Sequence, residues 1–136
     1  MARKPKEFHN HPLKLDDTFP EYRAVVQHIV DGDTFDVFID LGLNQYAYET
    51  IRLAYVDTPE IFRPDDEAEK QAGFAAKARV EELILGKPVK LITYKDRASF
   101  GRYVAEVFYP VGEGDSPHEW ISLAGTLVDE GHATET

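Results

Sequence analysis

Cysteine is absent from the 136 residues, and methionine and tryptophan occur once each. Without cysteine, disulfides and thiolate-bound metal sites are excluded. No apolar run approaches the roughly 20 residues that span a bilayer, so no membrane segment is expected. The basic start at residues 1–8 has no apolar stretch behind it. No secretory signal is therefore predicted, which leaves a cytoplasmic protein or a processed secreted form.

Positive charge is also scarce, because 15 Lys and Arg stand against 25 Asp and Glu, a net charge of −10. Residues 1–20 carry +1 and residues 21–136 carry −11. Proteins that hold phosphate backbones usually cluster Lys and Arg. Composition alone therefore argues against a nucleic-acid partner, unless a localised site with bound metal reverses the local charge. With 43% apolar residues, the chain does have enough material for one core.

Apolar patterning predicts one domain at residues 21–136, preceded by a loosely ordered extension at residues 1–20. Five strands and two helices are expected, with the second helix starting at Ser116-Pro117-His118-Glu119 and ending at Gly131. The strands are predicted at residues 22–30, 34–40, 46–56, 89–94 and 102–109, and the first helix at 66–85. This order predicts a mainly β protein of the α+β class: a five-stranded Greek-key barrel of the oligonucleotide/oligosaccharide-binding (OB) type, with a helix after the third strand and a C-terminal helix.

Charged residues stand where the predicted strands end. Asp31-Gly32-Asp33-Thr34 and Asp57-Thr58-Pro59-Glu60 are each, taken alone, more typical of plain turns with surface carboxylates. Arg52 is different, because its neighbours are apolar and its charge needs a partner or a ligand. Arg52 and Asp57 are an odd number of residues apart, so an ideal strand would place them on opposite faces. They share a site only if the chain bends near Val56.

Together, these residues fit the hydrolysis of a phosphodiester, which needs charge neutralisation at the phosphate and an activated water. Carboxylates such as Asp33 and Asp57 are hard oxygen donors for Ca²⁺ or Mg²⁺. Two arginines can hold phosphate oxygens, and Glu60 is placed to orient or deprotonate water. With no cysteine and five histidines, the chain suits an oxygen-ligated metal better than zinc.

Four segments resemble the staphylococcal nuclease family: Val30-Asp31-Gly32-Asp33-Thr34, Ile51-Arg52-Leu53, Val56-Asp57-Thr58-Pro59-Glu60 and Phe100-Gly101-Arg102. The resemblance runs from about Ala24 to Ala133. It implies a five-stranded barrel of the type argued above. It also implies Ca²⁺-dependent cleavage of DNA and RNA that leaves 3′-phosphate ends.

The resemblance also implies a role for each matching residue. The metal ligands would be the carboxylates of Asp33 and Asp57 and the backbone carbonyl of Thr58. The groups that act on the substrate would be Arg52 and Arg102, which hold the scissile phosphate, and Glu60, which acts on the attacking water. Asp31 would contact the metal ligands without binding the metal itself, and Phe100 would be available to stack on a base.

Two departures from the family keep other functions open. This chain is acidic where the staphylococcal enzyme is basic, and Ser99-Phe100 replaces a Lys-Tyr pair before Gly101-Arg102. One alternative is a binding or interaction module with the same barrel and no catalysis, and another is a barrel that binds a small phosphorylated ligand. The complete charged site favours the nuclease, with single-stranded DNA or RNA as the preferred substrate. The acidic surface favours the module, or a nuclease that works with a second copy or a basic partner protein.

Overall fold

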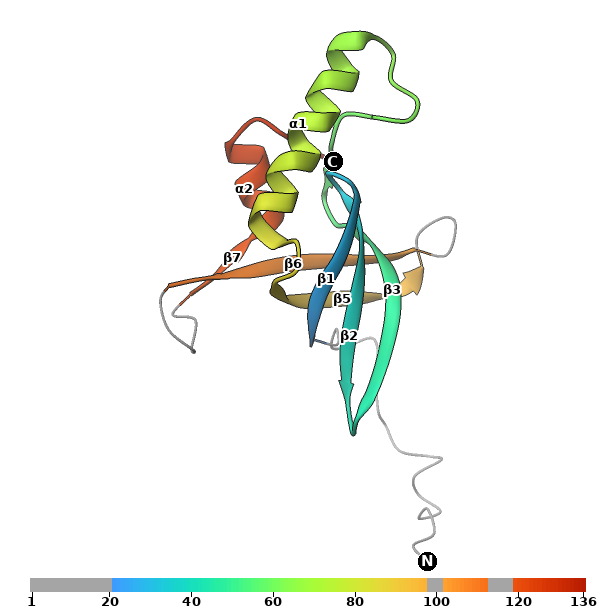
Figure 1. The fold of residues 1–136 in the computed structure, drawn as a ribbon, viewed down its shortest axis with the longest axis vertical. Coiled ribbons are helices and arrows are strands. Elements are labelled where there is room, and N and C mark those ends of the chain that lie inside the picture. Colours follow the sequence, from blue (N-terminus) through green and yellow to red (C-terminus); the bar gives the residue numbers. More distant parts are fainter. Residues whose placement is uncertain (1–20, 98–101, 113–118) are drawn as a thin grey trace, which may run out of the picture.

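The computed structural model describes residues 21–97, 102–112 and 119–136. The predicted extension at residues 1–20, Phe100 and the predicted helix start at residues 116–118 lie outside this part of the chain. Two helices and several strands make up the described part (Figure 1). None of its helices is both long and apolar enough to cross a membrane.

A closed barrel forms the body of the protein and confirms the predicted fold class (Figure 1). The strands are hydrogen-bonded in the order β3-β2-β1-β5-β6-β7, and β3 also pairs in parallel with β6. That last pairing closes five strands into a barrel, which β7 extends at one edge. The strands are β1 (Glu21–Asp31), β2 (Thr34–Gly42), β3 (Gln45–Leu53), β5 (Pro88–Arg97), β6 (Tyr103–Val111) and β7 (Glu119–Ser122).

Side chains that alternate along the middle of β2 help to fill the barrel. Phe35, Val37 and Ile39 are buried, whereas Phe38 and Asp40 are exposed. This difference is expected because successive side chains of a strand point to opposite faces. Helix α1 (Glu67–Ile84) packs on β1 and covers one end of the barrel with fully buried side chains such as Val80 and Ile84 (Figure 1). The core is therefore shared between the barrel interior and the inner face of this helix.

Helix α1 begins where the sequence predicts. Asp66 is extended and its Oδ1 accepts a hydrogen bond from the Glu69 amide at 2.7 Å. This bond satisfies one of the amides that the first turn leaves without a helical partner. Glu67 and Glu69 add negative charge at the positive end of the helix dipole.

The third strand was predicted as one element over residues 46–56, and this prediction is wrong at its end. Strand β3 stops at Leu53, Ala54 and Tyr55 form a turn, and Tyr55 has a positive φ of 70°. A separate two-residue strand, β4 (Val56–Asp57), pairs with β8 (Thr134–Glu135). The break supplies the bend that Arg52 and Asp57 need in order to share a site.

The second helix also starts later than predicted. Residues Glu119–Ser122 form strand β7 against β6, and α2 spans Leu123–Asp129 with Ser122 as its N-cap. The Ser122 hydroxyl accepts a hydrogen bond from the Gly125 amide at 3.1 Å. Trp120 therefore belongs to a strand and not to the helix, whereas Leu123 and Leu127 of α2 are fully buried.

Candidate active site

One groove collects the residues singled out from the sequence. It has a volume of about 860 Å³ and lies where the β1–β2 turn, the end of β3 and the segment after β4 meet. Every predicted site residue within the described part of the chain lines it: Asp31, Asp33, Arg52, Asp57, Thr58, Glu60 and Arg102. Residues that lie up to 71 positions apart in the sequence are thus gathered on one surface.

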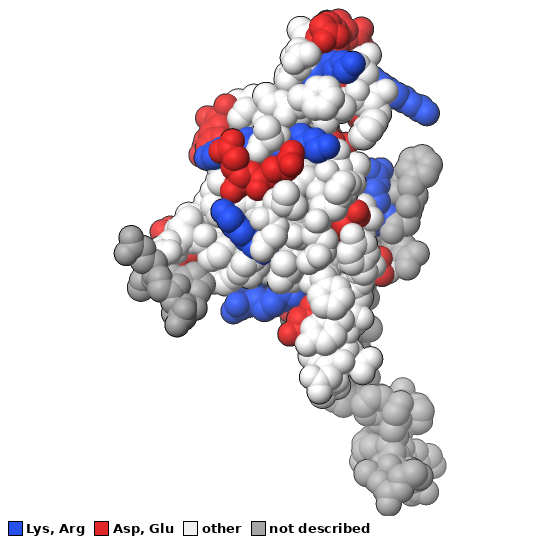
Figure 2. Space-filling model, viewed as in Figure 1, with Lys and Arg blue, Asp and Glu red and all other residues white. Residues whose placement is uncertain are grey.

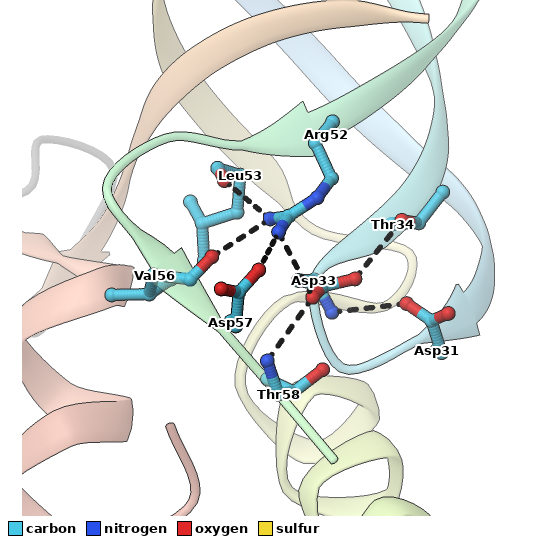
Figure 3. A network of polar contacts seen from close by, with 8 residues as sticks. All are labelled: Asp31, Asp33, Thr34, Arg52, Leu53, Val56, Asp57 and Thr58. Carbon is cyan, nitrogen blue, oxygen red and sulfur yellow. Dashed lines mark hydrogen bonds and ion pairs between the residues drawn. The ribbon is translucent and has the colours of Figure 1, made fainter. Parts of the chain in front are cut away.

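Arg52 is the hub of the polar network in this groove (Figure 3). Its Nη1 donates to the carbonyl oxygens of Leu53 at 2.7 Å and Val56 at 2.9 Å. Its Nη2 contacts the Asp57 carboxylate and lies 3.5 Å from Asp33 Oδ2. One guanidinium therefore fixes the turn between β3 and β4 and neutralises two carboxylates at the same time.

Asp33 is buried, with 8% of its surface exposed, and both of its oxygens are engaged (Figure 3). Oδ1 accepts a hydrogen bond from the Thr34 hydroxyl at 3.1 Å, and Oδ2 accepts one from the Thr58 amide at 3.1 Å. The Thr58 bond ties the β1–β2 turn directly to the segment after β4. Asp31 completes the turn, since its Oδ1 accepts a hydrogen bond from the Asp33 amide at 3.2 Å.

The two aspartates of this turn differ in their pKa. Burial raises the pKa of Asp31 to about 7, and its hydrogen bond and charge repulsion with Asp33 act in the same direction. Burial also acts to raise the pKa of Asp33, but the hydrogen bonds from Asp31 and from the Thr58 amide, together with the charge of Arg52, lower it overall. Asp33 therefore stays ionised to a lower pH than Asp31 does.

Two glycines allow the backbone segments of the site to approach so closely. A Cβ at Gly32 would lie 2.9 Å from Thr58 Cγ2 and 3.0 Å from Ala76 Cβ. A Cβ at Gly73, on α1, would lie 2.8 Å from the Pro59 carbonyl oxygen. These distances are shorter than side chains tolerate, so glycine at both positions keeps the turn, the segment after β4 and α1 in contact.

Sequence reasoning gave no role to five residues that also line the groove: Val30, Thr34, Thr50, Phe62 and Arg63. Phe62 is 68% exposed, and Arg63 adds a third guanidinium to those of Arg52 and Arg102. Both follow Glu60 closely in the chain, which was the available signal for them. Thr50 lies two residues before Arg52 on β3, so the strand period places the two on the same face.

The donor set fits a hard divalent cation. Carboxylate oxygens of Asp33 and Asp57 both face one nitrogen of Arg52, so a positive charge already stands between them. Among the residues that the structure describes, no three His, Cys, Asp or Glu side chains are arranged to hold a metal unaided. Two carboxylates and the Thr58 carbonyl would therefore supply only part of a Ca²⁺ shell of six to eight oxygens, and water or phosphate would supply the rest.

Chemically, the groove can bind an anion and a cation together. Its arginines suit the oxygens of a phosphate, its aspartates suit a metal, and Glu60 adds a further carboxylate to the lining. This combination, more than any one residue, is what distinguishes the groove from an ordinary polar surface.

Comparison with known proteins places the chain in a family. The family described as staphylococcal nuclease homologue matches residues 50–136. The micrococcal nuclease of Shigella flexneri is 27% identical over 113 residues, which cover 83% of this chain and 58% of that protein. The chain thus spans less than two thirds of the length of this relative. Because the family match covers more than half of the chain, this protein belongs to the staphylococcal nuclease homologue family.

Proposed function

We propose that this protein is a Ca²⁺-dependent nuclease that hydrolyses phosphodiester bonds in DNA or RNA and leaves 3′-phosphate ends. The observation that carries the proposal is the single groove in which three aspartates, a glutamate and three arginines come together. Membership of a nuclease family and likeness to a micrococcal nuclease support it. Mg²⁺ or another divalent cation is the alternative metal.

In this reaction, water attacks phosphorus and the bond from phosphorus to the 5′ oxygen breaks. Glu60 takes a proton from the water, and the leaving 5′ oxygen gains a proton to become a hydroxyl. Arg52 and Arg102 donate to the phosphate oxygens as negative charge builds up on them. Asp33, Asp57 and the Thr58 carbonyl would hold the metal, which supplies further charge neutralisation when bound.

The acidic surface favours a second candidate, an interaction module that has the barrel and the groove but does not cleave. A chain with a net charge of −10 repels a phosphate backbone at long range. Such a module has no need of Glu60, whereas cleavage does. The two candidates therefore differ in what happens when this carboxylate is removed.

The test is to incubate 5′-labelled single-stranded DNA and RNA oligonucleotides with the protein in Ca²⁺ or in excess chelator. We expect cleavage only in Ca²⁺, products whose mobility changes when phosphatase removes a 3′-phosphate, and loss of cleavage in Glu60→Gln. Glu81→Gln on α1 is the matched control, since Glu81 does not line the groove. Cleavage that persists in chelator would refute the metal requirement, and binding without any cleavage would favour the module.

A further inference from the structure

The outer face of the β2–β3 hairpin exposes three aromatic side chains that the site described above does not use. Phe38, Tyr46 and Tyr48 are 43%, 53% and 58% exposed. The rings of Phe38 and Tyr46 stack with centroids 5.1 Å apart and planes 6° from parallel. Phe38 pairs with Tyr48 in the strand register, so all three form one surface, here called the aromatic track. Figure 2 shows an uncharged surface over the lower end of this hairpin.

The aromatic track continues directly from the candidate groove. Arg52, Thr50, Tyr48 and Tyr46 alternate along β3 and share its outer face, while Ile51 between them is fully buried. Arg52 and Thr50 line the groove, so Tyr48 is the next residue on that face. At about 3.4 Å per residue, Tyr48 lies roughly 14 Å along the strand from Arg52.

The core does not require these aromatic rings. The inward residues of β2 already fill the barrel, and outward positions of a half-buried strand are ordinarily polar. Contiguous exposed apolar surface is unusual on soluble proteins, and where it occurs it commonly marks a binding site. A ligand that presents flat apolar faces explains the three rings.

Charge and chemistry indicate which ligand that is. The chain cannot attract a phosphate backbone over its whole surface, because residues 21–136 carry −11. Base stacking does not depend on attracting phosphate, and it is available only when the bases are unpaired. One acidic side chain beside the aromatic track already has partners, since Asp36 accepts a hydrogen bond from Thr50 at 2.6 Å and lies 3.4 Å from His28.

We propose that the aromatic track binds the bases of a single-stranded nucleic acid whose backbone passes through the candidate groove. The inference rests on the proposed nuclease function for the position of the scissile phosphate. It adds a length requirement to the single-stranded substrate: the strand must extend about four nucleotides beyond the scissile bond, since stacked nucleotides rise by about 3.4 Å each. A dinucleotide would fill the groove without reaching the aromatic rings.

The first test measures binding without cleavage. A fluorescein-labelled 12-nucleotide DNA strand is titrated with protein in chelator, and fluorescence anisotropy gives Kd. Phe38→Ala and Tyr48→Ala should each raise Kd about tenfold, because one stacked base is worth that much in comparable sites. Tyr48→Phe keeps the ring and should bind as the parent does. Phe74→Ala is the matched control, since Phe74 lies on α1 and is 44% exposed, close to the 43% of Phe38.

The second test separates the aromatic track from the groove by substrate length. Tyr48→Ala should raise KM for the 12-nucleotide strand about tenfold, leave kcat for it unchanged, and leave both constants for a dinucleotide unchanged. If Tyr48→Ala does not fold, judged by circular dichroism, Tyr48→Ile replaces it, because isoleucine favours strands and has no ring.

Three results would decide the matter against the proposal or in its favour. Parental Kd in both alanine variants overturns it. A sedimentation coefficient that shows the parent to be a dimer and Tyr48→Ala a monomer, with parental DNA binding in the variant, also overturns it and assigns the surface to self-association. Weakened binding in Phe38→Ala and Tyr48→Ala, found together with no cleavage by the parent, supports the aromatic track while refuting the nuclease proposal.

Discussion

Replacing Gly73 by alanine tests whether close packing between α1 and the segment after β4 positions Glu60. The added Cβ would lie 2.8 Å from both Ile61 Cγ1 and the Pro59 carbonyl oxygen, and 3.2 Å from the Glu60 carbonyl oxygen. Two of the three atoms belong to backbone, so the segment must move by several tenths of an ångström. Overpacking of this kind typically costs about 1–3 kcal/mol.

An opposing effect must be subtracted, because alanine favours a helix over glycine by about 1 kcal/mol. We therefore expect Gly73→Ala to lower the free energy of unfolding by about 1 kcal/mol, the difference between these two effects. Gly125→Ala on α2 is the matched control. A Cβ there meets only Ser122 Cβ at 3.5 Å and Ser122 Oγ at 3.6 Å, which are ordinary contacts. This variant should be about 0.5–1 kcal/mol more stable than the parent.

Urea unfolding followed by the fluorescence of Trp120, the single tryptophan, measures both free energies. Initial rates on a single-stranded oligonucleotide in Ca²⁺ measure the effect on the site. Because the displaced segment carries Glu60, we expect kcat of Gly73→Ala to fall on the order of tenfold and kcat of Gly125→Ala to stay at the parental value. If Gly73→Ala is as stable as Gly125→Ala and cleaves at the parental rate, the packing argument is wrong.

Three further predictions concern other parts of the molecule. Arg102→Ala should lower kcat on the order of 100-fold while the Ca²⁺ concentration at half-maximal rate changes little, because the lost donor acts on transition-state charge; a parental rate would remove Arg102 from the site. The rate on a single strand should stay flat or rise as KCl increases from low concentration, because salt screens the acidic surface, whereas a steep fall would indicate a basic groove. The hydrogen bonds from Arg79 at 2.7 and 2.9 Å lower the pKa of Glu130. Their stabilisation is therefore present at neutral pH and lost as the pH falls below 4.5, the ordinary value, so the Tm difference between parent and Glu130→Gln should vanish in acid.

Local sequence signals predicted much of the fold. The strand predicted at residues 34–40 corresponds to β2, and the helix predicted from residue 66 corresponds to α1, which Asp66 caps. The start of α2 was misplaced because Ser116 and Ser122 are both acceptable caps. The choice between them depends on Ser122 lying opposite Phe108 in the β6–β7 register, a contact between distant residues that local patterns do not contain.

The candidate site was predicted as a set of residues but not as a geometry. Motif spacing identified Asp33, Arg52 and Asp57. However, Arg52 and Asp57 are an odd number of residues apart, which on an ideal strand would place them on opposite faces. The turn at Tyr55, with its positive φ of 70°, resolves this conflict, and an aromatic residue gives no local signal for such a backbone. The aromatic track was missed because it depends on cross-strand pairing of Phe38 with Tyr48.

The most direct test of a metal-dependent nuclease site in this groove is the rate of oligonucleotide cleavage as a function of free Ca²⁺, compared between the parent and Asp33→Asn. Asparagine keeps the size of the side chain and one oxygen but removes the charge that faces Arg52. We predict that the parent is inactive in chelator and saturates with Ca²⁺, and that Asp33→Asn needs a much higher Ca²⁺ concentration for half its maximal rate. Cleavage by the parent in chelator, or identical Ca²⁺ curves for the two proteins, would contradict this account of the site.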